Sequence, residues 1–236
     1  MNIVAGKLIA RIKRTPSVES FRFTVAEPID FLPGQFVQVI FDPGQPQNKE
    51  LNKYLSFSAS PRRPYIEVTK RLSDSAFSRK LAALKTGDKI MLRGPLGTCV
   101  FSDAMLRVGF LIGGIGITPV ASILEYITDR RINIDANLLY SNRTDEEIAF
   151  KPELDRFSQI QPSIKINYTV TECQPKDKAC AYGRIDEKFV RARMADAAER
   201  VCFIFGPPVM VVAMRKLCLD LECQKENIRA ESFAGY

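Results

Sequence analysis

The sequence predicts two domains of different class: an amino-terminal antiparallel β-barrel and a carboxyl-terminal α/β domain built on a parallel sheet. Short runs that alternate apolar and polar residues, separated by Pro and Gly, continue to about residue 93. After residue 105, apolar strands alternate with helical stretches. The 236 residues, 46% of them hydrophobic, suffice for two modest cores. We place the boundary near residue 104, which gives domains 1–104 and 105–236.

Two runs in the first part are typical of barrel strands. Residues 21–25 and 37–41 alternate in polarity, and the turn residues Pro33 and Gly34 precede the second run. Residues 74–84 differ, because their large apolar residues recur at intervals of three and four. This spacing predicts a short amphipathic helix.

The sequence pattern of the second part predicts strands that alternate with helices. The predicted strands are 108–112, 134–140, 166–170 and 201–205, and the predicted helices are 119–129, 189–198 and 209–221. This alternation implies a parallel sheet with helices on both faces.

The composition limits the chemistry. Six cysteines lack a CxxC pair and there is no histidine, so no recognised zinc, haem or iron–sulfur ligand spacing occurs. We therefore expect no metal site and an organic redox cofactor. The sequence has neither the pattern of a signal peptide nor an apolar stretch that could span a bilayer, so a cytoplasmic location with reduced thiols is expected.

The net charge of +7 comes entirely from the first part. Residues 1–104 contain 16 Lys and Arg against 9 Asp and Glu, whereas residues 105–236 contain 18 of each class. The basic stripes typical of nucleic-acid binders are missing. We expect an acidic protein partner or an anionic cofactor, with an ordinary solvated surface as the alternative.

A glycine-rich turn follows the first predicted strand of the second part. Gly113, Gly114 and Gly116 allow a pyrophosphate to approach the backbone, and Thr118 is placed to cap the next helix, with Pro119 in its first turn. The spacing differs from GxGxxG, and a packing role for the glycines is the alternative. Further loops follow at residues 140–144 and 205–210, with a terminal segment at 231–236, and strand-end loops of a parallel sheet share one edge.

Several ordered segments resemble the ferredoxin–NADP reductase superfamily over nearly the whole chain. The segments are residues 33–36, 53–61, 68–78, 94–97, 113–119, 205–210 and 231–236. The resemblance implies an FAD-binding barrel at 1–104 and an NAD(P)-binding domain at 105–236.

The family's Arg-x-Tyr-Ser flavin motif falls on Lys53, Tyr54, Leu55 and Ser56, with two changed letters. Lysine keeps the positive charge of arginine but cannot form two parallel hydrogen bonds to a phosphate. Leucine lacks the aromatic ring that would stack on the isoalloxazine. Ser56 matches the residue expected near flavin N5; a strand serine bonded to backbone is the alternative. By the same resemblance, the remaining flavin-binding residues are Val68, Thr69, Lys70, Ser75, Ala76, Phe77 and Ser78. Because the pyrophosphate site is approximately kept, we favour FAD over FMN.

The nucleotide motif Cys-Gly-x-x-x-Met appears as Phe205 to Met210, so a bulky ring replaces the cysteine and is expected to obstruct the nicotinamide or to stack on it. Glu231 aligns with an acidic residue that assists catalysis together with Ser56. Phe233 and Tyr236 are expected to cover the flavin, with terminal packing as the alternative. The predicted nucleotide-binding residues are Gly113, Gly114, Gly116, Ile117, Thr118, Ser141, Asn142, Arg143, Thr171, Glu172, Phe205, Gly206, Pro207 and Met210.

The resemblance implies hydride transfer between nicotinamide C4 and flavin N5, followed by electron transport to a one-electron carrier such as ferredoxin, flavodoxin or an oxygenase component. Glu172 favours NADH over NADPH by repelling a 2′-phosphate, although Arg143 and Lys176 lie in neighbouring loops. Two alternatives stay open: a free-flavin reductase, and an electron-transfer or regulatory subunit that has lost productive nicotinamide docking.

Overall fold

The computed structural model describes residues 2–233. Contacts between residues divide the chain into two units. The first comprises residues up to Phe101 together with Thr118–Tyr126, and the second comprises Ser102–Ile117 and the chain from Ile127 onward. We describe each unit by itself.

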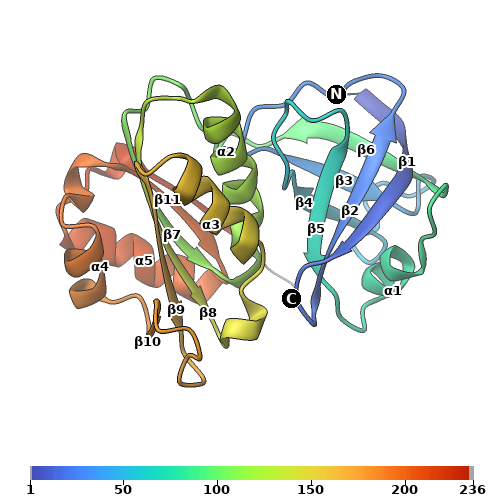
Figure 1. Cartoon of the computed structure of the whole chain (residues 1–236). Helices are drawn as coiled ribbons and strands as arrows, with labels where there is room; N and C mark the ends of the chain where they lie inside the picture. The colour runs from blue at the N-terminus through green and yellow to red at the C-terminus, as the bar shows by residue number, and fades with distance from the viewer. Residues whose placement is uncertain (1, 234–236) are drawn as a thin grey trace. The chain divides into compact units, whose positions relative to one another are not determined.

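The first unit contains a six-stranded antiparallel sheet in the order β4-β3-β6-β1-β2-β5. Its strands are β1 (Asn2–Lys13), β2 (Val18–Val25), β3 (Phe36–Ile40), β4 (Asn52–Ser56), β5 (Ile66–Arg71) and β6 (Lys89–Leu96). The segment just after β4 reaches the other end strand, β5, through a bridge between Phe57 and Val68 and a bond from the Ser58 amide to the Glu67 carbonyl at 2.9 Å. The sheet therefore curls into a barrel with a seam between β4 and β5 (Figure 1). This confirms the predicted barrel.

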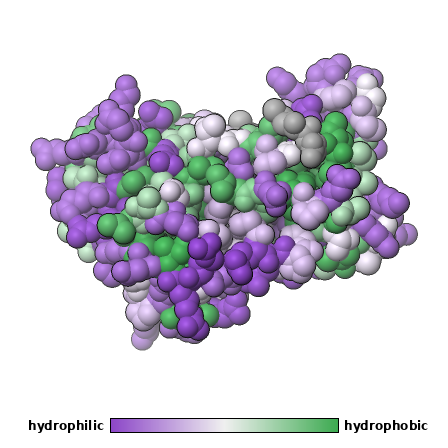
Figure 2. All heavy atoms as spheres, turned by 90° about the horizontal axis from the view of Figure 1, so that it is seen from above, coloured by the Kyte–Doolittle hydropathy of each residue, from purple (hydrophilic) through white to green (hydrophobic). Residues whose placement is uncertain are grey.

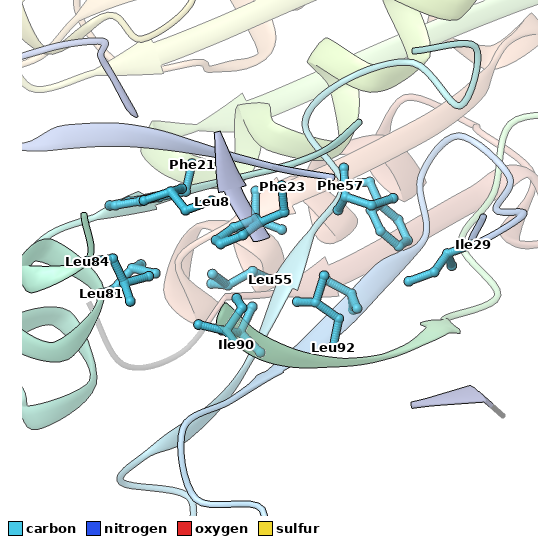
Figure 3. Packing of buried hydrophobic residues seen from close by; sticks show 14 of the residues in the cluster. Leu8, Phe21, Phe23, Ile29, Leu55, Phe57, Leu81, Leu84, Ile90 and Leu92 are labelled. Carbon is cyan, nitrogen blue, oxygen red and sulfur yellow. The ribbon is translucent and has the colours of Figure 1, made fainter. Parts of the chain in front are cut away.

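Apolar side chains from the strands and from helix α1 (Ala76–Ala83) fill this barrel. Figure 3 shows Leu55 and Leu92 from the strands, Phe57 just after β4, and Leu81 and Leu84 from the helical segment. Each such side chain contributes about 1.5–3 kcal/mol by leaving water. The three-and-four spacing that predicted the helix is therefore the spacing that faces the core.

Part of helix α2 (Ile117–Arg130) belongs to the first unit. The Ser122 hydroxyl donates to the Ala59 carbonyl at 2.7 Å. The Glu125 carboxylate accepts hydrogen bonds from the Ser60 amide at 2.6 Å and from Arg63 Nε at 2.8 Å. These bonds fix the loop after β4 against the helix.

The second unit contains a parallel sheet in the order β10-β9-β8-β7-β11-β12. Its strands are β7 (Arg107–Gly113), β8 (Asp135–Asn142), β9 (Ile164–Val170), β10 (Cys180–Tyr182), β11 (Val201–Gly206) and β12 (Ile228–Ser232). Its other helices are α3 (Lys151–Ile160), α4 (Glu187–Arg193) and α5 (Pro208–Asp220). Residues of α4 and α5 share a core with one face of the sheet, and Tyr168 on the other face donates to Asp155 of α3 (Figure 1).

Two helix boundaries differ from the prediction. The cap of α2 is Gly116, because a 3-10 turn at Gly114–Gly116 starts the helix early; the prediction of Thr118 as cap was wrong. Helix α4 begins after Asp186, whose carboxylate accepts from the Phe189 amide at 2.7 Å, and it ends at Arg193 rather than at residue 198.

The surface is mixed in polarity. Figure 2 shows hydrophilic residues in purple over much of the face seen from above, with hydrophobic residues in green among them. Val209 and Val212 of α5 are exposed by 84% and 70%. Within residues 2–233, the helices are too short or too polar to cross a membrane.

Candidate functional sites

Two lysines lie at the seam between β4 and β5. By strand alternation, Lys53 shares a face with Leu55, and Lys70 shares a face with Val68. Lys70 is only 4% exposed. Its burial, together with the nearby charge of Lys53, lowers its pKa to about 8. A buried cation beside a second cation favours binding of an anion at this seam.

The start of α1 adds hydrogen-bond donors. The Ser75 hydroxyl caps the helix by accepting from the Ser78 amide at 3.3 Å. The first turn carries no acidic side chain, and the amides of Ala76 and Phe77 have no acceptor among the described residues. Because Phe77 is buried in the core, the position of this helix start is fixed. Free amides at the positive end of a helix suit a phosphate.

Ser56 carries an available hydroxyl. The residue is 4% exposed and its strand pairs with Phe36, yet within residues 2–233 no group hydrogen-bonds to its hydroxyl. The hydroxyl oxygen itself is not enclosed by the protein, so a ligand or water can reach it. This hydroxyl, the two lysines and the α1 amides are the donors that a flavin with a diphosphate requires, so the residues of this unit fit FAD.

The other predicted flavin residues lie on both faces of their strands, with Leu55 on the face of β4 that carries Lys53 and Tyr54 on the face that carries Ser56. Leu55 lies in the barrel core (Figure 3). Tyr54 is 55% exposed on the opposite face of β4, where its ring meets Phe36 edge-on at 5.7 Å. The Thr69 hydroxyl bonds Ser20 at 2.6 Å and Ser58 at 2.7 Å. The Thr69 hydroxyl is therefore occupied by protein hydrogen bonds, whereas the Tyr54 ring lies on the same face of β4 as Ser56.

A buried carboxylate on β5, which the sequence pattern did not predict, forms ion pairs with two arginines. Glu67, 2% exposed, accepts from Arg22 Nε at 2.7 Å and from Arg14 at 3.1 Å, and Ser58 also donates to it. Only the paired strands reveal the arrangement, since Arg14 and Glu67 are far apart in sequence. The ion pair holds β5, and thus Lys70, in position.

The predicted nucleotide-binding loops share one edge of the parallel sheet. Gly113 of β7 pairs with Ser141 of β8, which pairs with Thr169 of β9. On the other side Ile112 pairs with Phe205, which pairs with Glu231 of β12. These loops therefore follow adjacent strand ends, with β7 in the middle. Such an edge is where open α/β sheets bind ligands.

The three glycines of the turn have different roles. A β-carbon at Gly116 would lie 2.3 Å from the Phe205 carbonyl oxygen, and one at Gly113 would lie 2.3 Å from the Met210 sulfur. These two glycines permit close packing. Gly114, with φ of +51°, faces open space. It alone leaves room for a phosphate to approach the backbone. Ile117 and Thr118 are buried in the first turn of α2.

The end of β8 holds a second orphaned group. Asn142 is 5% exposed, and neither its side-chain nitrogen nor its oxygen has a hydrogen-bond partner in the described chain. Nearby, Arg143 and Glu172 form an exposed ion pair at 3.5 Å, and the Thr171 hydroxyl donates to the Asn142 carbonyl. The amide is thus free to donate to and accept from a ligand at this edge.

The residues after β11 are more buried than their predicted role implies. Phe205 is fully buried, and its ring meets Phe233 edge-on at 6.2 Å. The Phe233 amide donates to the Gly206 carbonyl at 2.9 Å. Burial raises the pKa of the Glu231 carboxyl, which favours its protonated form. Pro207 precedes α5, whereas Tyr236 lies outside the described residues.

Comparisons with known proteins agree with this architecture. A family model described as an oxidoreductase FAD-binding domain matches residues 5–101, and one described as an oxidoreductase NAD-binding domain matches residues 110–216. The chain is 28% identical over 226 residues to NADH-cytochrome b5 reductase 1 of Mortierella alpina, covering 94% of this chain and 76% of that protein. It is 29% identical over 222 residues to the protein of the same name from Coccidioides immitis, covering 88% and 71%.

Solved structures share the fold. The FAD/NAD-binding domain of a nitric oxide dioxygenase from Vibrio cholerae aligns with a TM-score of 0.84 at 16% identity, covering 98% of both chains. A ferredoxin NADP+ reductase from Neisseria gonorrhoeae aligns with a TM-score of 0.82 at 22% identity, covering 98% of this chain and 99% of that one.

Together the curled barrel with its FAD-binding match and the parallel sheet with its NAD-binding match define a two-domain flavoprotein, an oxidoreductase of NAD(P)H and FAD. Both matches occur in one chain in the order that the sequence predicted. The chain belongs to the ferredoxin–NADP reductase superfamily. This confirms the predicted family, fold and cofactors.

Proposed function

We propose that the chain is an NADH-dependent reductase that passes electrons through FAD to a one-electron acceptor protein of the cytochrome b5 type. The observation that carries the proposal is similarity through both units to proteins named NADH-cytochrome b5 reductase. Those names favour a cytochrome acceptor over the ferredoxin or flavodoxin that the sequence alone suggested. The basic first part suits a carrier with an acidic face.

The residues of the first unit would hold the flavin. Bound FAD supplies an acceptor for hydride and a donor of single electrons. Lys53, Lys70 and the start of α1 would neutralise its diphosphate, and the Ser56 hydroxyl would hydrogen-bond to its ring. The support is that each of these groups is positioned by burial or by a strand.

The second unit would hold the nucleotide. The Gly114 backbone leaves room for phosphates, and the Asn142 amide is available for hydrogen bonds. Glu231, with its raised pKa, would hold a proton beside the nicotinamide. That Ser56 and Glu231 act together remains a proposal.

Preference for NADH would come from Glu172, whose carboxylate can accept from a ribose 2′-hydroxyl and repels a 2′-phosphate. The ion pair with Arg143 weakens the positive charge that could otherwise attract that phosphate. Lys176, the other cation nearby, is paired with Glu146 at 2.7 Å.

The test compares acceptors. Purified protein is loaded with FAD, and NADH-driven reduction of cytochrome b5, ferredoxin and free FMN is followed at low and high ionic strength. We expect cytochrome b5 to be reduced fastest, with a rate that falls as salt rises, because charges steer the encounter. Faster reduction of ferredoxin, or of free FMN with no retained FAD after gel filtration, would reject the proposal.

A further inference from the structure

Three cysteines from separate segments of the second unit converge in its core. Cys202 lies on β11, Cys218 on α5, and Cys223 in the turn that follows α5. Their sulfur atoms all lie within 4.8 Å of one another, and the residues are 0%, 1% and 4% exposed. No spacing in the sequence reveals this cluster, since the fold alone brings β11 against the end of α5.

Hydrogen bonds join two of these thiols to one backbone carbonyl. Cys202 and Cys223 both donate to the Ala197 carbonyl, at 3.8 Å and 3.3 Å. A thiolate could not donate these bonds. Hydrogen bonds with the two neighbouring thiols, together with burial, raise the pKa of Cys202, whereas hydrogen bonds with Cys202 and Cys218 lower the pKa of Cys223. Cys223 is therefore the thiol of the cluster that gives up its proton most readily.

In the part of the chain that the structure describes, no carboxylate and no further thiol joins the cluster. It sits in an apolar core with Met194, Val211 and Leu221 among its neighbours. The group of candidate ligands found among residues 2–233 contains these three thiols and no carboxylate, and the chain has no histidine. Structural zinc sites use four ligands, so zinc fits this set poorly.

The net charge of the complex with three thiolates distinguishes the other ions that bind sulfur. Three thiolates around a dication leave one negative charge, and around a monocation they leave two. A charge buried in an apolar core costs several kcal/mol. Three thiolates around a trivalent ion leave none, so a trivalent ion with three sulfur ligands matches both the ligand number and the apolar surroundings.

We propose that Cys202, Cys218 and Cys223 form a binding site for trivalent arsenic. Neutral arsenous acid, As(OH)3, reacts with the three thiols: three arsenic–sulfur bonds form, three arsenic–oxygen bonds break, and each hydroxide leaves as water with one thiol proton. Arsenic stays trivalent and no electrons are transferred. Because the reactants and the product are all uncharged, no charge enters the core.

Access would pass through the turn after α5. Cys223 is the most exposed of the three, and Glu222 before it adopts a φ of +63°. Local opening of this turn would admit the ligand, so binding is expected to be slow and to end in a more stable protein.

The test titrates the reduced full-length protein with sodium arsenite alone. We expect one arsenic per chain by native mass spectrometry, with loss of three hydrogens, and a raised melting temperature. Cys202→Ser, Cys218→Ser and Cys223→Ser should each weaken binding by at least about 100-fold, since even outer partners of a bound ion are worth 10–100-fold. The matched controls Cys99→Ser, Cys173→Ser and Cys180→Ser should bind like the wild type.

A second measurement needs no variant. Arsenite-treated and untreated wild-type protein are alkylated in partial denaturant, and modified cysteines are mapped by mass spectrometry. Selective protection of Cys202, Cys218 and Cys223 supports the site. Absence of arsenite binding, protection of the control cysteines instead, or tighter binding of Zn(II) than of arsenite would overturn it.

Discussion

Lys53 on β4 repels Lys70 on β5 across the seam of the barrel. Burial of Lys70 and the charge of Lys53 together lower the pKa of Lys70 to about 8. The Lys70 ammonium group donates to the Arg71 carbonyl at 3.2 Å, and a bound anion would offset the repulsion between the two cations. The flavin diphosphate is the anion that we expect there, and this pair is therefore a point where cofactor binding and stability are linked.

The FAD-free protein should become more stable as pH rises. The pKa of Lys70 is about 8 when folded against an ordinary value of 10.5, so between these values the unfolded chain binds more protons and stability increases with pH. The full effect is roughly 3 kcal/mol. Urea unfolding of the FAD-free protein from pH 7 to pH 10.5 measures it. Lys70→Met should remove the rise, and an equal rise in that variant would refute the assignment.

Ser56→Ala should slow flavin reduction without affecting folding. Its hydroxyl has no partner among residues 2–233, so its loss should change the free energy of unfolding by less than about 0.5 kcal/mol. Stopped-flow measurement of flavin bleaching by NADH should show a rate lower by roughly 10-fold or more. Ser20→Ala, which removes a bonded hydroxyl, is the control expected to lower stability instead. A Ser56→Ala enzyme with the wild-type rate would exclude the role.

Substitutions at two glycines of the turn should distinguish a packing role from a nucleotide-binding role. Gly116→Ala places a β-carbon 2.3 Å from a backbone oxygen and should destabilise the protein by about 2–4 kcal/mol. Gly114→Ala meets open space and costs only about 1–2 kcal/mol for its left-handed backbone. Gly114→Ala should nevertheless weaken NADH binding more than its stability loss suggests. Denaturation curves and NADH titrations of both variants check this, and equal effects would contradict it.

Phe205→Cys restores the residue that the family has at this position. Because the Phe205 ring is fully buried against Phe203 and Phe233, we expect a cavity and a loss of about 3–5 kcal/mol, as for other large-to-small core changes. Because the buried ring is packed inside the unit, we expect it not to obstruct the nucleotide, and the rate of flavin reduction should not rise. A rate increase of more than about 10-fold, equivalent to 1.4 kcal/mol, would show that the ring does obstruct it.

Glu172→Arg should shift nucleotide preference toward NADPH. The change removes a carboxylate that is paired with Arg143 and places two cations where a 2′-phosphate would lie. The ratio of kcat/KM for NADH to that for NADPH should fall by roughly 10-fold or more. Asp220→Arg, which breaks the exposed pair with Lys216 at the end of α5, is the control. An unchanged ratio in Glu172→Arg would show that Glu172 does not set the preference for NADH.

The sequence predicted elements whose patterns are local. Residues 108–112 form β7 and residues 74–84 contain α1, because alternating or three-and-four spacing directly reports the buried face. The Thr118 cap failed because a 3-10 turn, which leaves no such pattern, precedes the helix.

Site features that depend on strand pairing were not predictable. The proximity of Lys53 to Lys70 requires barrel closure, and the Glu67 ion pairs require β2 and β5 to be neighbours. The separate roles of Gly114 and Gly116 depend on where β11 lies, which residue spacing does not specify.

An anaerobic titration of the FAD-loaded protein with NADH, followed by its visible spectrum, is the decisive measurement. We expect one equivalent of NADH to bleach the flavin rapidly, and added cytochrome b5 to restore its colour. A flavin that stays oxidised in excess NADH would show that this chain does not pass electrons from a nicotinamide nucleotide to a one-electron carrier.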